Sequence, residues 1–341
     1  MAEATTLTSK DFQSSQDVRW CPGCGDYSIL ANVQRVMPDL GVPKENFVFV
    51  SGIGCSSRFP YYMNTYGMHT IHGRAPAFAT GIKASRPELS VWVVTGDGDG
   101  LSIGGNHLLH TIRRNVDLQI LLFNNRVYGL TKGQYSPTSR LGMKTKSTPD
   151  GAIDHPVDPI AFALGASATF VARTVDVHAS HLQEILRRAH EHKGTAFIEI
   201  LQNCPVYNDD EWFEVEDRKS RVEAALVLED GQPLVWGPDD QRRGIRIDNG
   251  IPSIVHLGKD DDPVAKGIAV HHERHESPAY AFALASLQRP HFPLPIGVFR
   301  AVEKPSYDRL LDDQVESAIA RRGHGDLAKL LHSGDTWTVG D

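Results

Sequence analysis

Cysteine, long hydrophobic runs and concentrated positive charge are all scarce in this sequence of 341 residues. No apolar run approaches the length of a membrane-spanning helix, so we expect no membrane partner. The 35 Lys and Arg against 42 Asp and Glu give a net charge of −7, and the basic residues are scattered, which argues against a nucleic-acid partner. The N-terminal stretch MAEATTLTSKDFQSSQ lacks the apolar segment of a secretory signal, so we expect a cytoplasmic protein.

The four cysteines are Cys21, Cys24, Cys55 and Cys204, and the first two form a Cys-x-x-Cys pair in a Pro-Gly loop. Disulfides are rare in cytoplasmic proteins, so this number fits a four-thiolate inorganic site. A zinc knuckle or a redox dithiol also uses a Cys-x-x-Cys pair. A zinc site usually has a second close pair, whereas a two-plus-one-plus-one set suits a [4Fe–4S] cluster. Spacing alone leaves both metals open.

Short apolar runs alternate with helical patterns along the first two thirds of the chain. The runs are apolar on both faces, which predicts an α/β fold with a mainly parallel sheet flanked by helices. Residues after Cys204 lack this alternation, so we expect the sheet to end near Cys204. The expected strands lie at 47–50, 90–95, 118–125, 167–174 and 195–204, and the expected helices at 27–42, 77–86, 104–115, 158–166, 181–192 and 307–322.

The run WVVTGDGDG at residues 92–100 ends a predicted buried strand in two carboxylates set among glycines. Ligands of open α/β sheets bind beyond the carboxyl ends of the strands, and glycines let the backbone approach a ligand closely. The N-terminus of a following helix attracts phosphate, but Asp97 and Asp99 would repel it. A divalent cation such as Mg²⁺, bridging carboxylate to phosphate, resolves this conflict.

The pair Asn124-Asn125 follows the next apolar strand, LQILLF. Asn125 lies 28 positions after Asp97 (125 − 97), about the length of a β-α-β crossover, which puts both strand ends at one sheet edge. An Asn amide oxygen is a neutral hard ligand that suits Mg²⁺ already facing two phosphates. A lone GDG is more often a tight turn, but together with NN at this spacing it resembles the thiamine-diphosphate motif.

Several motifs then occur in the order of one family. They are CPGCG (21–25), GIGCSSR (52–58), HGR (72–74), GDGD (96–99), NNRVYGLTKGQYSPT (124–138) and a late Cys204 after a strand. Together they resemble the β subunit of 2-oxoacid:ferredoxin oxidoreductases, most closely that of the 2-oxoglutarate enzyme, over residues 18–210. We therefore divide the chain into an N-terminal arm (1–20), a thiamine-diphosphate and [4Fe–4S] domain (21–210), and a C-terminal arm or extension packing on this domain or on a partner (211–341).

The resemblance implies roles for individual residues. The cluster ligands would be Cys21, Cys24, Cys55 and Cys204, and the Mg²⁺ ligands Asp97, Asn125 and the carbonyl of Val127. Contacts to thiamine diphosphate would come from Ile53, Gly54, Cys55, Ser56, His72, Gly96, Gly98, Asp99, Gly129 and Leu130, with Gly98 and Asp99 on the diphosphate side.

The catalytic residues implied by the resemblance are Arg58, Lys132 and His72. Arg58 and Lys132 align with positions that meet the substrate carboxylate, and a dicarboxylate needs cations. His72 would contact the diphosphate or the reacting centre, although a structural histidine is an equally good interpretation. In the polar run HHERHE, His271 and His275 lack an obvious third ligand, so we expect a solvated surface there rather than a metal site.

The implied chemistry is decarboxylation of a 2-oxoacid on thiamine diphosphate, one-electron transfer through the cluster to ferredoxin, and acyl transfer to coenzyme A. The same chemistry on pyruvate or another 2-oxoacid is an alternative, as is a non-redox thiamine-dependent lyase with structural zinc. A non-catalytic iron–sulfur subunit is disfavoured by the intact Asp97 and Asn125. Because this chain has one sheet-sized unit, the pyrimidine-binding domain would belong to an α subunit in an α₂β₂ assembly.

Overall fold

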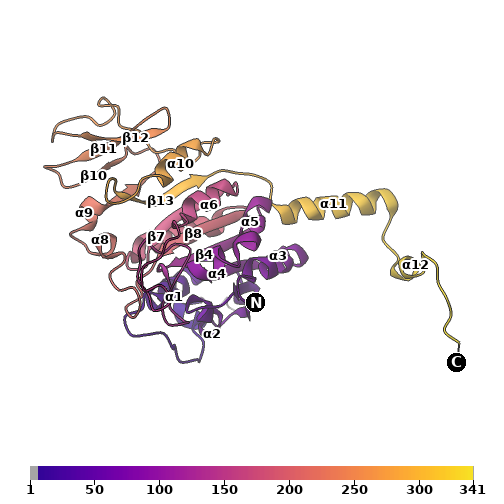
Figure 1. Cartoon of the computed structure of the whole chain (residues 1–341). Coiled ribbons are helices and arrows are strands. Elements are labelled where there is room, and N and C mark those ends of the chain that lie inside the picture. The colour runs from indigo at the N-terminus through magenta and orange to yellow at the C-terminus, as the bar shows by residue number, and fades with distance from the viewer. Residues whose placement is uncertain (1–6, 341) are drawn as a thin grey trace.

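An eight-stranded sheet lies at the centre of the computed structural model, which describes residues 7–340 (Figure 1). Neighbouring strands are parallel except β7 and β13, which are antiparallel. The predicted α/β fold with a mainly parallel sheet is therefore confirmed. In order across the sheet the strands are β2 (Tyr66–His69), β1 (Phe47–Ser51), β3 (Ser90–Gly96), β4 (Leu118–Asn124), β8 (Thr195–Leu201), β7 (Phe170–Val175), β13 (Leu294–Ala301) and β9 (Ala225–Leu228).

Helices cover both faces of this sheet, because successive strand side chains point to opposite faces and both sets are apolar. In β3, Trp92 and Val94 join one buried cluster, whereas Val91 and Val93 join the other. The first cluster contains side chains of α1 (Asp26–Val36) and α7 (Ala179–Glu191). The second contains side chains of α3 (Ala75–Ser85), α5 (Gly105–Arg114), α6 (Pro159–Gly165) and α10 (Ala279–Ala285).

Two predicted elements differ in detail from the structure. The helix expected over 27–42 is α1 followed by the short 3-10 helix Met37–Leu40, because Pro38 cannot continue the α-helical hydrogen bonds. The GDGDG run is not a loop: Asp97–Leu101 form the short helix α4 directly after β3. The helix predicted over 307–322 is confirmed as α11 (Tyr307–Arg322).

The expectation that the sheet ends near Cys204 is wrong. The later strands β13 and β9 extend the sheet beyond β7, and Ile296, Val298 and Phe299 of β13 are buried. This pairing joins segments more than a hundred residues apart, so no local pattern signals it. A separate antiparallel sheet follows from residues 235–256, with strands β10 (Val235–Trp236), β11 (Arg243–Asp248) and β12 (Ile251–His256).

The two ends of the described chain differ in how they pack. Residues 1–6 of the predicted N-terminal arm lie outside the described part, but Phe12 and Trp20 are buried against the body, so residues 7–20 are not loose. At the other end, α11 and α12 (Leu327–Leu331) extend away from the body (Figure 1). Among residues 7–340, no helix is both long and apolar enough to cross a membrane.

The expectation of a solvated HHERHE segment is wrong for His271. This side chain is buried, and its Nε2 lies 2.8 Å from the carbonyl oxygen of Val298 in β13. Its Nδ1 lies 3.3 Å from the Tyr280 hydroxyl. His271 is therefore packed against strand β13 and does not face solvent.

Candidate functional site

Four neighbouring parallel strands, β1, β3, β4 and β8, deliver the sequence motifs to one edge of the sheet. Their carboxyl ends run into GIGC (52–55), GDGDG (96–100), Asn124-Asn125 and the segment 202–204 that ends in Cys204. Parallel pairing forces this convergence, since all four strands end on the same side. The predicted crossover between Asp97 and Asn125 is confirmed by the pairing of β3 with β4.

A cavity of about 510 Å³ opens between these strand ends. Thirteen residues predicted to contact thiamine diphosphate or Mg²⁺ line it, so the structure brings that whole set together: Ile53, Gly54, Cys55, Ser56, His72, Gly96, Asp97, Gly98, Asp99, Asn125, Val127, Gly129 and Leu130. Sequence reasoning missed the other lining residues, which are Asp26, Phe123, Tyr128, Thr131, Gln134 and Gln202. The roles of the predicted residues stay predictions.

Asp97 is a buried carboxylate with hydroxyl partners. Its Oδ2 accepts hydrogen bonds from Ser136 Oγ at 2.5 Å and from Thr138 Oγ1 at 2.6 Å. Burial raises the pKa of Asp97 to about 6, although both hydroxyls oppose this shift. Within residues 7–340 no Lys or Arg forms an ion pair with it. A divalent cation therefore fits here, because it supplies the positive charge that the protein does not.

Asp99 is occupied by bonds within the protein. Its Oδ1 accepts from the backbone N–H groups of Ile53 at 3.1 Å and Gly73 at 2.7 Å, and lies 2.5 Å from His72 Nδ1. Its Oδ2 accepts from Thr95 Oγ1 at 2.7 Å. Asp99 thus ties the GIGC loop and the HGR loop to the end of β3, and it holds His72 at the cavity wall. This gives His72 an orienting partner while leaving its other ring nitrogen free to face the cavity.

Asn125 lies in the loop between β4 and the two-residue strand β5 (Val127–Tyr128). Its Oδ1 accepts from the Val127 N–H at 3.2 Å, and its Nδ2 donates to Gln202 Oε1 at 2.9 Å. The amide oxygen has two lone pairs, so one acceptor position remains for a ligand in the cavity that Asp97 also lines. Gln202 also donates to Cys24 Sγ at 3.2 Å, which connects this loop to the cysteines.

The four cysteines are free thiols: Cys55 lines the cavity, Cys204 ends the segment after β8, and Cys24 accepts a hydrogen bond from Gln202 of the cavity wall. A Cβ atom built on Gly129 would lie 3.6 Å from both Cys55 Sγ and Cys204 Sγ. Burial raises the pKa values of Cys24, Cys55 and Cys204, that of Cys55 to about 12, and the charge of Asp26 raises all three further. Thiolates in this position need a cationic partner, which the iron of a cluster provides.

Geometrically, no three His, Cys, Asp or Glu side chains among residues 7–340 already form a metal-holding group. Support for a cluster therefore comes from the positions of the individual cysteines and of Gly129. Gly129, with no Cβ, leaves room between two sulfurs, and Cys21 lies exposed in its loop beside Cys24. The donor set is four sulfurs, which is the set that a [4Fe–4S] cluster takes.

The two predicted substrate cations lie in different surroundings. Arg58 lines a second cavity of about 580 Å³, which shares Ile53, Gly54 and Leu130 with the first. Its guanidinium donates to the Arg19 carbonyl at 3.3 Å. Lys132 is exposed, lines neither cavity, and has a left-handed backbone with φ of 76°. The structure thus brings Arg58, but not Lys132, next to the cofactor cavity.

Comparison with known proteins agrees with the architecture. Residues 52–200 match the family described as "Thiamine pyrophosphate enzyme, C-terminal TPP binding domain", which is the class of domain that this sheet and cavity define. The 2-oxoglutarate oxidoreductase subunit KorB of Mycobacterium tuberculosis is 51% identical over 97% of this chain and 88% of its own length. The chain therefore belongs to the β-subunit family of 2-oxoacid:ferredoxin oxidoreductases.

Another relative and a solved structure resemble this chain over much of its length. The 2-oxoacid:ferredoxin oxidoreductase β subunit of Sulfolobus is 47% identical over 67% of this chain and 74% of its own. A solved structure of 2-oxoglutarate:ferredoxin oxidoreductase from Magnetococcus marinus, with 2-oxoglutarate, coenzyme A and succinyl-CoA bound, matches with a TM-score of 0.75 and 32% identity. That match covers 98% of both chains.

Proposed function

We propose that this chain is the β subunit of a coenzyme A-dependent 2-oxoglutarate:ferredoxin oxidoreductase, and that it holds thiamine diphosphate, Mg²⁺ and one [4Fe–4S] cluster. One observation carries the proposal: the ends of four adjacent strands border one glycine-lined cavity, which contains the buried carboxylate of Asp97, with no ion-pair partner among residues 7–340, and the thiol of Cys55, with Cys204 close by. The relatives named for 2-oxoglutarate support this substrate over pyruvate. The cytoplasmic location stays a prediction.

The residues present suit these groups. When bound, thiamine diphosphate supplies the carbon nucleophile for decarboxylating a 2-oxoacid, and the cluster supplies a one-electron acceptor. Asp97, Asn125 and the Val127 carbonyl would hold Mg²⁺ against the diphosphate, and Gly96 and Gly98 leave room for it. Cys55 and Cys204 flank Gly129 at the cavity wall, so electrons would have a short path from the cofactor to the cluster.

A partner chain completes the proposed site. The α subunit would contribute the pyrimidine-binding domain, including a glutamate that activates the ring, and two αβ units would form an α₂β₂ assembly. Ferredoxin would accept the electrons. The cavity residues Ile53, Leu130 and Thr131 come from GIGCSSR and NNRVYGLTKGQ, the loops that we expect to face the α subunit.

Reconstitution tests this function. The chain with its cluster is mixed with thiamine diphosphate, Mg²⁺, coenzyme A, a viologen acceptor and a panel of 2-oxoacids, with and without the α subunit. We expect coenzyme A-dependent viologen reduction with 2-oxoglutarate, and only with both subunits. Preference for pyruvate would change the substrate assignment, and full turnover by the isolated chain would contradict the shared active site.

Metal analysis distinguishes the cluster from zinc. Anaerobically purified protein should contain iron and acid-labile sulfide, and Cys204→Ser should lose both while still binding thiamine diphosphate. Stoichiometric zinc without sulfide would instead support the non-redox lyase alternative.

A further inference from the structure

A strained residue lies between two of the proposed Mg²⁺ ligands. Arg126 separates Asn125 from Val127, and its φ of 58° is left-handed, a conformation that residues with a Cβ rarely adopt. In the same turn after β4, Asn125 Oδ1 accepts a hydrogen bond from the Val127 N–H. The local geometry of the proposed metal loop therefore depends on keeping Arg126 left-handed.

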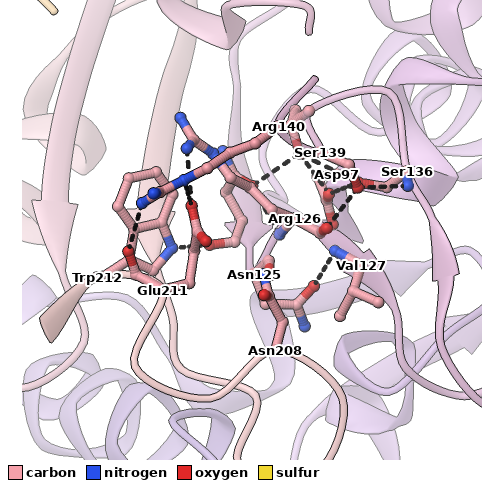
Figure 2. Close-up of polar contacts among 12 residues, drawn as sticks. Asp97, Asn125, Arg126, Val127, Ser136, Ser139, Arg140, Asn208, Glu211 and Trp212 are labelled. Atoms are coloured by element: carbon pink, nitrogen blue, oxygen red, sulfur yellow. Dashed lines mark hydrogen bonds and ion pairs between the residues drawn. The ribbon is translucent and has the colours of Figure 1, made fainter. Parts of the chain in front are cut away.

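Two residues from another part of the chain hold the Arg126 side chain (Figure 2). Its guanidinium donates to Glu211 Oε1 at 2.7 Å, and it lies over the Trp212 ring, 4.3 Å from the ring centroid. The Glu211 side chain is only 8% exposed, so this ion pair is shielded from water. Arg140 also donates to Glu211 Oε1, at 2.7 Å, from a more exposed position.

The backbone of the same turn is fixed residue by residue. Trp212 Nε1 donates to the Asn124 carbonyl at 2.8 Å, and Asn208 Nδ2 donates to the Asn125 carbonyl at 2.9 Å. Ser139 Oγ donates to the Arg126 carbonyl at 2.5 Å. Segment 208–212 thus supplies two of these three donors as well as both partners of the Arg126 side chain.

We propose that Glu211 is a positioning residue for the metal loop, acting by clamping the Arg126 side chain so that the strained turn presents Asn125 and Val127 to Mg²⁺. This inference rests on the proposed function, because that function assigns Mg²⁺ to this loop. Glu211 itself does not line the cofactor cavity, so its effect must pass through Arg126.

Four variants of the full chain, co-purified with its α subunit, test the clamp. Mg²⁺ affinity is measured by calorimetry in the presence of thiamine diphosphate, and thermal unfolding reports the fold. Glu211→Ala should weaken Mg²⁺ binding about 10- to 100-fold, the usual effect of removing a residue that orients a ligand. Arg126→Ala should weaken it as much, because alanine keeps the strained Cβ and loses the clamp.

Arg126→Gly is the decisive variant. Glycine adopts the left-handed conformation without support, so Mg²⁺ binding should stay within about threefold of wild type although the guanidinium is gone. Arg140→Ala is the matched control: it removes the other cation on Glu211 from a position without strain and should also stay within about threefold.

The outcomes separate this inference from the proposed function. Equal weakening by Arg126→Gly and Arg126→Ala would overturn the positioning role, because it would show that the guanidinium itself matters. Mg²⁺ binding of wild-type affinity in Glu211→Ala would also overturn the positioning role. If Glu211→Ala does not fold, the comparison of Arg126→Gly with Arg126→Ala still tests the positioning role. A wild-type complex that binds no thiamine diphosphate would overturn the proposed function and this inference together.

Discussion

Asp97 and Asp99, both in the short helix α4, differ in their hydrogen-bond partners. Asp97 has two hydroxyl partners and faces the cavity, whereas Asp99 accepts hydrogen bonds from two backbone N–H groups and a hydroxyl and pairs with His72. The pattern GDGDG alone predicts a cation site, and it is the family resemblance that implies Asp97 as the ligand and places Asp99 on the diphosphate side. Asp97 is therefore available to a metal ion, whereas the hydrogen bonds of Asp99 position the loops next to the cavity.

Replacing each aspartate with alanine should separate these roles. Asp97→Ala should lower thiamine diphosphate affinity about 100-fold or more while changing the free energy of unfolding by about 1 kcal/mol or less. Asp99→Ala should lower the free energy of unfolding by about 3 kcal/mol, because it leaves buried donors without an acceptor. Calorimetry and denaturant unfolding measure the two effects. Unchanged cofactor affinity in Asp97→Ala would refute the metal assignment.

Asp176 should make the stability of the fold depend on pH. It is fully buried, and burial together with the charge of Asp26 raises its pKa from 3.8 to about 7. The folded chain therefore retains a proton that the unfolded chain releases above about pH 4, so this residue lowers stability as pH rises from about 4 to 7.

Asp176→Asn removes that titration. In the metal-free chain, the variant should have a higher Tm than wild type at pH 8, where the buried charge is fully present. It should differ little at pH 5, where the wild-type side chain is neutral. Thermal unfolding at both pH values is the measurement, and an equal difference at the two would contradict the buried titration. Asp209→Asn, at an exposed position, is the control.

At the scale of elements, the five predicted strands were recognisable because each is buried on both faces, whereas the exposed edge strand β2 was missed. The run from Val91 to Val94 and the run LQILLF both show this burial. The family resemblance implied thirteen of the cavity-lining residues, and the common end of the parallel strands explains why they meet. Glu211 and Trp212 could not be found this way: they reach Arg126 only through tertiary folding across 85 positions, and no local pattern marks them.

The two-stranded hairpin of β5 and β6 (Gln134–Tyr135) places Gly129 against two cysteine sulfurs. Gly129→Ala should fold normally, because its new Cβ would lie at ordinary contact distance, 3.6 Å, from both sulfurs. It should nevertheless lower iron and labile sulfide to less than about half of wild type, because the methyl group takes space that a cluster needs.

The control for this substitution is Gly105→Ala in α5, where a Cβ would meet no heavy atom within 4 Å. Its iron and sulfide content should equal that of wild type. Full cluster content in Gly129→Ala would show that the cluster does not lie beside this loop.

At the scale of the whole molecule, the C-terminal segment contributes to the central sheet, forms the separate sheet β10–β12, and ends in two helices. β9 and β13 belong to the central sheet, whereas α11 and α12 extend away from the body (Figure 1). Leu327, Leu330, Leu331 and Trp337 are each at least 69% exposed. α11 is attached chiefly at its first turn, where Asp308 accepts from the Asp117 N–H at 2.9 Å.

Removing residues 323–341 should therefore leave the fold of the body intact. We expect the free energy of unfolding to change by about 0.5 kcal/mol or less, because the deleted residues from 323 to 340 are exposed. Denaturant unfolding of the truncated chain measures this. A loss of several kcal/mol would show that the end of the chain contributes to the core.

The order of the central sheet affects how the isolated chain behaves in solution. Both outermost strands, β2 and β9, are only four residues long, so the sheet offers little unpaired backbone to a neighbouring molecule. Without β9 and β13, the six-residue strand β7 would be the margin, and it is buried on both faces. Once the chain is complete, the pairing of β13 with β7 covers this edge and opposes edge-to-edge aggregation of the folded protein.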